Sequence, residues 1–300
     1  RGDSLLREPG IHEAVMVDQV ISNLLVNKKG SYVDCTFGLG GHASAILKNL
    51  DSEAELIGID RDPESFEAAN EVIKKDKRFS FINDKFGNLE DHFPGESLDG
   101  ILVDLGISSR QLDNPERGFS FQTQGPLDMR MNQSEVDSAE TWLNKSSKEE
   151  ITRVLWEKGE ERNSRKIAEK ICRERDVSPI NTTQRLIEII VACKPRKSKR
   201  HPATNVFRAI RMEINSEMEE LQNVLIAAGC LLKNGGRLAV ISFHSLEDRI
   251  VKRFLQGKSL DGKKFSFHKV GSKHFKPNKE EIIKNPRSRS AILRISEKVA

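Results

Sequence analysis

A short glycine-rich turn carries the residue types best suited to chemistry in this chain. Gly38-Leu39-Gly40-Gly41-His42 follows an apolar stretch that ends at Asp34. Glycines let such a turn bend tightly and approach a ligand without a Cβ in the way. Asp60 ends the next apolar stretch, about 20 residues further on, where an acid accepts hydrogen bonds from ribose hydroxyls. The pattern indicates a site for an adenosine-containing cofactor.

Two cofactor classes share this device, and the glycine spacing favours one of them. The turn lacks a third glycine at the dinucleotide spacing. Asp34 would repel a pyrophosphate, but it suits a cofactor with a charged amino-acid end, such as S-adenosylmethionine (SAM). An NAD-type oxidoreductase and a purely structural turn remain open as alternatives. We interpret His42 as a helix-start residue whose side chain, if near the ligand, would be a binding contact.

A second group of polar residues follows a later apolar stretch. Asp104 ends that stretch, and Ser108, Ser109 and Gln111 follow within seven residues. Asp104 could accept a hydrogen bond from a cofactor or substrate amine, or it could cap the next helix. His244 follows the apolar stretch 237–243 and could either face a cleft or be a satisfied structural histidine.

The elements that must position these residues form an alternating pattern, which predicts a parallel sheet covered on both faces. The expected strands are 31–37, 55–60, 79–83, 99–105, 237–243, 264–269 and 291–296. The expected helices are 42–50, 63–76, 135–144, 148–158, 162–175, 183–191, 204–232 and 246–255, and Ser147 is an expected helix cap. Residues 256–264 and 272–285 are expected to be loops. We therefore predict an α/β fold, with a discontinuous cofactor-binding domain at 1–112 and 206–300 and an inserted helical domain at 113–205.

Composition sets outer limits on the function. The 300 residues are 37% hydrophobic and 31% charged, which is typical of a soluble globular protein. No apolar run approaches the roughly 18 residues that span a bilayer, and the start has no signal-peptide core, so no membrane partner is expected. The four cysteines are widely spaced, which argues against a zinc site or disulfides and favours a reducing compartment. No metal is expected, and the net charge of +4 permits nucleic-acid binding.

Longer motifs make the sequence specific. In chain order they include Thr36–His42, Asp60–Pro63, Asp104–Ser109, Gln111–Asp113, Glu116–Phe121, Gly125–Met131, Gly159–Arg162, His201–Thr204, Ser242–Arg249 and Asn285–Ser290. They cover nearly the whole chain. With these motifs the sequence closely resembles the RsmH (MraW) family, the SAM-dependent methyltransferases that modify the exocyclic N4 amine of a cytidine in small-subunit (16S-type) ribosomal RNA, near the decoding centre.

The resemblance implies a class I (Rossmann-like) methyltransferase sheet with a helical insertion. It implies SAM contacts at Gly40, Gly41, His42, Asp60, Phe86, Asp104 and Gln111. It also favours an assembled small ribosomal subunit as the substrate and a bacterial cytoplasmic protein. An organellar location is open if the chain, which lacks an initial methionine, is a processed form. Dimerisation through the helical parts is also left open.

Methyl transfer from a sulfonium is an in-line displacement, so the protein mainly aligns the reacting atoms. The cytosine amine is a weak nucleophile, and an acceptor that polarises its N–H bonds would help. Asp104 is the first candidate for this acceptor and Ser108 an alternative, with His244 as a third candidate catalytic residue.

A flipped or unstacked base also needs phosphate anchors. Five basic residues lie within seven positions of the insertion, which we interpret as a phosphate-binding segment: Lys194, Arg196, Lys197, Lys199 and Arg200. Arg117 and Arg130 are further candidates for RNA contact. A ribosome-assembly RNA-binding factor without turnover is a rival interpretation, against which the intact glycine turn and Asp104 argue.

Overall fold

The structure, a computed structural model, describes residues 14–135, 137–194 and 201–300. They form two compact units. The sheet unit comprises the described residues up to Gly106 together with Gln222–Ala300, and the helical unit is Ile107–Leu221. Within the described ranges, every helix is too short or too polar to cross a bilayer.

The sheet unit contains a mixed sheet. Its strands are β1 (Ser31–Asp34), β2 (Glu55–Ile59), β3 (Phe79–Ile82), β4 (Leu98–Asp104), β5 (Leu232–Ser242), β6 (Ser266–Lys269) and β7 (Ile292–Val299). Their order in the sheet is β3-β2-β1-β4-β5-β7-β6. The first five strands in this order are parallel to one another, whereas β7 runs antiparallel to both of its neighbours, β5 and β6. This is the strand order of a class I methyltransferase sheet, so the predicted fold class is confirmed.

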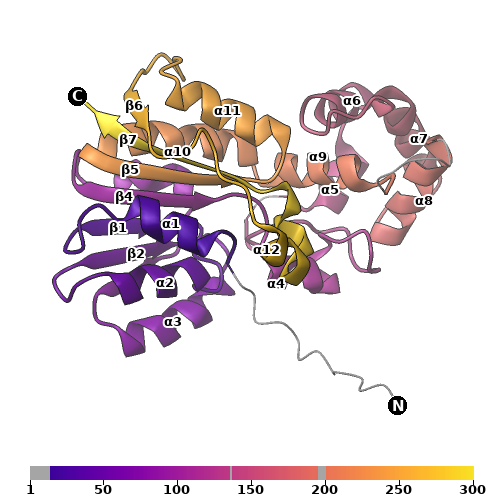
Figure 1. The fold of residues 1–300 in the computed structure, drawn as a ribbon. Helices are drawn as coiled ribbons and strands as arrows, with labels where there is room; N and C mark the ends of the chain where they lie inside the picture. Colours follow the sequence, from indigo (N-terminus) through magenta and orange to yellow (C-terminus); the bar gives the residue numbers. More distant parts are fainter. Residues whose placement is uncertain (1–13, 136, 195–200) are drawn as a thin grey trace. The chain divides into compact units, whose positions relative to one another are not determined.

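Helices cover both faces of this sheet (Figure 1). The helices and 3-10 turns of the unit are α1 (Val17–Leu24), α2 (Gly41–Asn49), α3 (Ser65–Lys75), η1 (Phe86–Asp91), α11 (Ser245–Leu255), α12 (Lys279–Lys284), η3 (Pro286–Ser290) and the part of α10 (Glu217–Leu231) from Gln222 onward. Figure 1 shows α1, α2 and α3 along one face of the sheet and α10 and α11 over the other.

Alternation along the strands decides which side chains meet the first of these helix layers. Tyr32 of β1 and Leu102 of β4 belong to one buried cluster with Leu24 of α1 and Ile46 of α2. Because side chains alternate between the faces of a strand, Asp34 and Asp104 point to the same face as Tyr32 and Leu102. The sheet therefore directs both acids toward the helix layer that contains α2.

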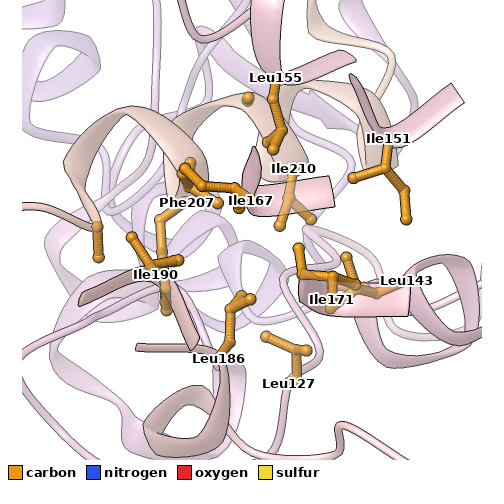
Figure 2. Packing of buried hydrophobic residues seen from close by; sticks show 14 of the residues in the cluster. Leu127, Leu143, Ile151, Leu155, Ile167, Ile171, Leu186, Ile190, Phe207 and Ile210 are labelled. Atoms are coloured by element: carbon orange, nitrogen blue, oxygen red, sulfur yellow. The ribbon is translucent and has the colours of Figure 1, made fainter. Parts of the chain in front are cut away.

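The helical unit packs around its own core. Its elements are α4 (Ser109–Asp113), η2 (Pro115–Arg117), α5 (Ala139–Lys145), α6 (Lys148–Glu157), α7 (Ser164–Val177), α8 (Thr183–Cys193), α9 (Thr204–Ile214) and the start of α10. Apolar residues recur at helical spacing, for example Leu186, Ile189 and Ile190 in α8, and they converge with residues of α5, α6, α7 and α9 (Figure 2). Ser147 caps α6 by accepting a hydrogen bond from the Glu150 amide, as predicted.

The structure corrects two predictions about elements. The single helix expected over 204–232 is two helices, α9 and α10, which are separated at Asn215 and Ser216, where Ser216 has a φ of 49°. The buried Asn215 side chain accepts from the Met131 amide and donates to the Met129 carbonyl, both at 2.8 Å. The predicted loop 272–285 contains the short helix α12.

Candidate active site at the carboxyl edge of the sheet

Asp34, Asp60 and Asp104 all follow the carboxyl ends of parallel strands. Asp34 ends β1, where it pairs with Gly58 of β2 and Leu102 of β4. Asp104 ends β4, and Asp60 comes directly after β2. The sheet therefore gathers three carboxyls at the edge where open α/β sheets bind their ligands.

The glycine turn is fixed by one of these acids. The Gly38 amide donates to Asp60 Oδ2 at 2.7 Å, and the Asp62 amide donates to Asp60 Oδ1 at 2.9 Å. Gly40 has a φ of 77°, and a Cβ there would lie 2.8 Å from the Phe37 ring. Backbone conformation and internal packing both require glycine at position 40. Burial is the main cause that raises the pKa of Asp60 above its ordinary value.

Helix α2 starts immediately after this turn. Gly40 is its N-cap residue, and no side chain caps the helix start. The first amides of a helix have no intrahelical partner, and the helix dipole favours negative charge there. Gly41 and His42 contribute such amides, so the turn can receive the carboxylate of an amino-acid group.

Asp34 is a fully buried acid next to the site. Its side chain is 0% exposed, so it offers no surface to a ligand, contrary to the role that the charge argument suggested. Oδ1 accepts from the Thr36 amide at 3.1 Å, while Oδ2 is buried and has no hydrogen-bond partner among the described residues. Burial raises the pKa of Asp34 to about 7, and the nearby charge of Asp60 adds to the increase.

Asp104 is the acid with one side toward solvent. Its side chain is 22% exposed. Oδ1 is nevertheless buried without a hydrogen-bond partner in the described part of the chain. Burial raises the pKa of Asp104 to about 7; His42 opposes this increase, whereas Asp34 and Glu247 add to it. Asp104 is therefore an acid that can exchange a proton near neutral pH.

The buried imidazole of His42 lies beside the carboxyl of Asp104. Its side chain is 5% exposed. Nε2 is 2.8 Å from the Val15 carbonyl oxygen, and Nδ1 is 3.7 Å from Asp104 Oδ2. Because a carbonyl only accepts, Nε2 carries the proton in this contact and Nδ1 faces the carboxyl. The imidazole is thus directed at Asp104 by the chain segment before α1.

His244 has a structural role in this arrangement. It is the N-cap residue of α11, and its Nδ1 accepts from the Glu247 amide at 3.5 Å. Its Nε2 lies 3.0 Å from Glu247 Oε1, and both side chains are buried. Glu247 Oε2 also accepts from the Phe243 amide at 2.9 Å. Nε2 nevertheless has no hydrogen-bond partner among the described residues, so His244 caps a helix without being fully satisfied.

The remaining predicted cofactor contacts, Phe86 and Gln111, and the candidate catalytic residue Ser108 are divided between the units. Phe86 begins η1 in the sheet unit and is partly exposed. Ser108 and Gln111 belong to the helical unit, where they form a capping box at α4: Ser108 Oγ accepts from the Gln111 amide, and Gln111 Oε1 accepts from the Ser108 amide. The cap that the sequence left open for Asp104 is therefore supplied by Ser108.

Three of the predicted RNA contacts are engaged inside the helical unit. Arg117 is 2% exposed and donates to the carbonyls of Arg130 and Met131 at 3.0 and 2.8 Å. Arg130 forms a two-pronged pair with Asp128. Lys194 Nζ lies 2.5 Å from Glu161 Oε2 and also donates to the Pro202 carbonyl. These contacts indicate structural roles for all three residues.

The other four predicted RNA contacts, Arg196, Lys197, Lys199 and Arg200, lie outside the described residues. Sequence reasoning in turn gave no role to Thr36, Val15 and Glu247, all of which contact the site acids or histidines. Only Glu247 had a visible signal, because an acid three residues after a helix cap is a common pairing. No cluster of metal-binding side chains occurs among the residues that the structure describes.

Comparisons with known proteins identify the family of this chain. Residues 10–299 match a model described as the MraW methylase family. The chain is 45% identical over 307 residues to ribosomal RNA small subunit methyltransferase H of Idiomarina loihiensis, covering 96% of this chain and 97% of that protein. It is 44% identical over 305 residues to the protein of the same name from Coxiella burnetii, covering 96% and 99%.

Among solved structures, the chain is similar to a putative rRNA methylase from Clostridium thermocellum, with 14% sequence identity, a TM-score of 0.44, and coverage of 94% of this chain and 95% of that one. The match of the family model spans almost the entire sequence, and the 44–45% identity of the relatives extends over nearly their full length. This chain belongs to the MraW methylase family.

Proposed function

We propose that this protein transfers the methyl group of SAM to the exocyclic N4 amine of a cytidine in small-subunit ribosomal RNA. The observation that carries the proposal is the family match over residues 10–299 of a chain whose sheet has the class I methyltransferase order. The similarity to relatives named ribosomal RNA small subunit methyltransferase H covers nearly the full length of those proteins. This similarity supports the same substrate class for this chain.

The carboxyl edge of the sheet suits SAM in its charge pattern. The start of α2 at Gly41 and His42 would receive the carboxylate of the cofactor, and Asp60 would accept from its ribose. Phe86 would provide an apolar wall for the adenine. The partly exposed side chain of Asp104 gives this edge a carboxyl with which a cationic ligand would pair. Gln111 of α4 is a further proposed contact to SAM.

When bound, SAM supplies a methyl group already activated by a positively charged sulfur. The protein then has to orient the amine and accept its proton. Asp104 is the proposed acceptor because it is partly exposed and its pKa is raised to about 7, near the pH at which a base must exchange protons. Ser108 and His244 are weaker candidates, since both side chains are engaged in helix caps.

The test is transfer of labelled methyl from SAM to ribosomal RNA isolated from cells that lack the modification. Naked RNA and assembled small subunits are compared as substrates, and we expect the assembled subunit to be preferred. Mapping the label must place it on N4 of a cytidine. Asp104→Asn should reduce turnover by roughly 100-fold or more, the usual contribution of an acid–base group. Label on another atom or base would refute the proposed specificity.

The methyl-transfer assay, together with calorimetry, distinguishes the proposed function from its rivals. A ribosome-assembly factor would bind RNA without transferring label, and an NAD-type oxidoreductase would bind NAD in calorimetry. We expect SAM binding without NAD binding. We propose a cytoplasmic location, since the proposed substrate is a bacterial ribosomal subunit. Sedimentation with and without RNA would decide whether a dimer forms.

A further inference from the structure

His42 connects three separate segments of the sheet unit. It lies in the first turn of α2, its Nε2 contacts the carbonyl of Val15 just before α1, and its Nδ1 faces Asp104 at the end of β4. The side chain is almost completely buried, so little of the ring is available to a ligand. Its geometry is that of a residue directed at another side chain of the protein.

The groups around Asp104 affect whether its carboxyl is protonated. Asp34 from β1 and Glu247 from α11 are acidic neighbours, and each favours the protonated form of Asp104. Burial acts in the same direction. Of these influences, only His42 favours the carboxylate. Without the imidazole, Asp104 would remain protonated over a wider pH range and could not accept a proton.

We propose that His42 is a positioning residue for Asp104: its imidazole, oriented by the Val15 carbonyl, faces the carboxyl through Nδ1 and holds Asp104 ready as the proton acceptor. The inference rests on the proposed methyl transfer. In that reaction the amine nitrogen forms a bond to the methyl carbon, and the carbon–sulfur bond breaks with its electron pair left on sulfur. One proton leaves the nitrogen for Asp104 Oδ2. Until then His42, as a cation with a proton on both ring nitrogens, stabilises Asp104 as a carboxylate.

The proposal differs from a direct cofactor contact in what it predicts for the free enzyme. A residue that only touches SAM would change the affinity for SAM and leave the titration of Asp104 unmoved. A residue that only supports the fold would change stability alone. A positioning residue changes the pH at which Asp104 loses its proton, even when no cofactor or RNA is present.

The experiment is infrared titration of the protonated carboxyl band in the SAM-free protein, with Asp104→Asn subtracted to isolate the Asp104 signal. His42→Gln keeps an N–H donor for the Val15 carbonyl but cannot become positively charged. Its midpoint for Asp104 should move to higher pH by about one unit or more, the usual effect of removing a nearby opposite charge. Asp34→Asn, which removes a neighbouring negative charge, should move the midpoint to lower pH.

Turnover provides the second readout. The acidic limb of the pH profile for kcat should move in the same direction as the infrared midpoint in each variant. If His42→Gln does not fold, 15N spectra of the wild-type protein and Asp104→Asn replace it. Nδ1 of His42 should then be protonated to a smaller extent at the same pH once Asp104 is neutral.

The outcomes are distinguishable. An Asp104 midpoint that stays in place in His42→Gln, or an Nδ1 signal that ignores Asp104→Asn, would overturn the inference while leaving methyl transfer intact. Absence of methyl transfer by the wild-type protein would overturn the proposed function and, with it, the role given to His42. Opposite shifts in His42→Gln and Asp34→Asn, together with methyl transfer, are the expected result.

Discussion

The main-chain amide of Asp104 donates a hydrogen bond to the hydroxyl oxygen of Thr36 at 2.7 Å. The Thr36 hydroxyl in turn donates toward Asp34 Oδ1 at 3.4 Å. A single hydroxyl group therefore joins Asp104 at the end of β4 to Asp34 at the end of β1. This contact fixes the backbone that carries the proposed acceptor, and it links Asp104 to the buried acid beneath the glycine turn.

Removing that hydroxyl should disturb the site. Thr36→Val keeps the shape of the side chain but leaves the Asp104 amide without its acceptor. We expect the free energy of unfolding to fall by about 1–3 kcal/mol, the cost of an unsatisfied buried group. SAM affinity should fall as well, because the ends of β1 and β4 are no longer tied together. Urea unfolding and calorimetry measure the two effects.

Thr36→Ser is the matched control, because it retains the hydroxyl and loses only a methyl group. It should stay close to the wild-type protein in both measurements. Equal losses in Thr36→Val and Thr36→Ser would show that packing of the methyl group, and not the hydrogen bond to Asp104, explains the effect.

The raised pKa of Asp34 predicts how stability depends on pH. Its pKa is about 7 in the folded protein, well above the ordinary value of 3.8, so between these values the folded state retains a proton that the unfolded chain has released. Between these values, rising pH therefore lowers the free energy of unfolding, by up to roughly 1.4 kcal/mol per pH unit for one such group. This contribution to stability is complete at acidic pH and is lost toward pH 7.

Asp34→Asn should make that slope less steep in the SAM-free protein, because the amide does not titrate, while Asp60 and Asp104, whose pKa values are also raised, continue to contribute. Urea unfolding at a series of pH values from mildly acidic to mildly basic provides the measurement. Asp91→Asn, a change at an exposed position, serves as the control and should leave the slope unchanged. A slope in Asp34→Asn as steep as that of the wild-type protein would assign the whole pH dependence to other groups.

The contact between Asn215 and the loop at Met129 and Met131 predicts the effect of a change far from the sheet. Asn215→Ala would leave the buried Met131 amide and the Met129 carbonyl without these partners. We expect a loss of about 1–3 kcal/mol for each unsatisfied group. Hydrogen exchange should localise the added opening to the 129–131 segment and the helix ends beside it.

Ser216 provides a control at the same helix break. Its φ of 49° is costly for a residue with a Cβ, so Ser216→Gly should keep stability or raise it by up to about 1 kcal/mol. Destabilisation by Ser216→Gly as large as that of Asn215→Ala would show that any change at the break is harmful, whatever hydrogen bonds it affects.

The same break shows where sequence patterns reach their limit. The strand positions could be predicted because apolar runs bounded by polar residues specify them locally. The division between α9 and α10 could not, because the apolar spacing continues through it and the break depends on contacts of Asn215 with a loop more than 80 residues away in the chain. Long-range hydrogen bonds of this kind leave no local signal.

In the site, too, some features could be predicted from the sequence and others could not. The acids at the strand ends could be predicted from the strand positions, since parallel strands bring their carboxyl ends together. Which acid is buried and which is partly exposed could not, because Asp34 and Asp104 occupy equivalent positions in the sequence pattern. Basic residues were the least predictable, because the sequence did not indicate that Arg117 and Lys194 would have partners inside the fold.

The ion pair of Lys194 and Glu161 leads to a prediction about stability. Both side chains are largely buried, so Lys194→Met would leave Glu161 without its partner. We expect a loss of about 3–5 kcal/mol, measured by urea unfolding. The double variant Lys194→Met/Glu161→Met should recover most of it, since an apolar pair can replace a buried ion pair. No recovery in the double variant would assign the loss to the other contacts of Lys194.

The basic segment that follows Lys194 is expected to act on RNA instead of on stability. Lys197, Lys199 and Arg200 lie outside the described residues, and their predicted role rests on the density of charge in the sequence. Replacing all three with Gln should weaken binding to ribosomal RNA. It should also reduce the slope of log K against log salt concentration by about 2, as expected for three lost contacts to single-stranded phosphates.

The matched control replaces three exposed lysines of the sheet unit, Lys28, Lys77 and Lys258, with Gln. Both variants lose the same net charge, so an effect of overall charge would appear equally in each. A site effect appears only when the segment after Lys194 is changed, because counterions are released only where phosphates contact the protein. SAM affinity should be unchanged in both variants, and equal salt slopes in the two would refute the RNA-binding role of the segment.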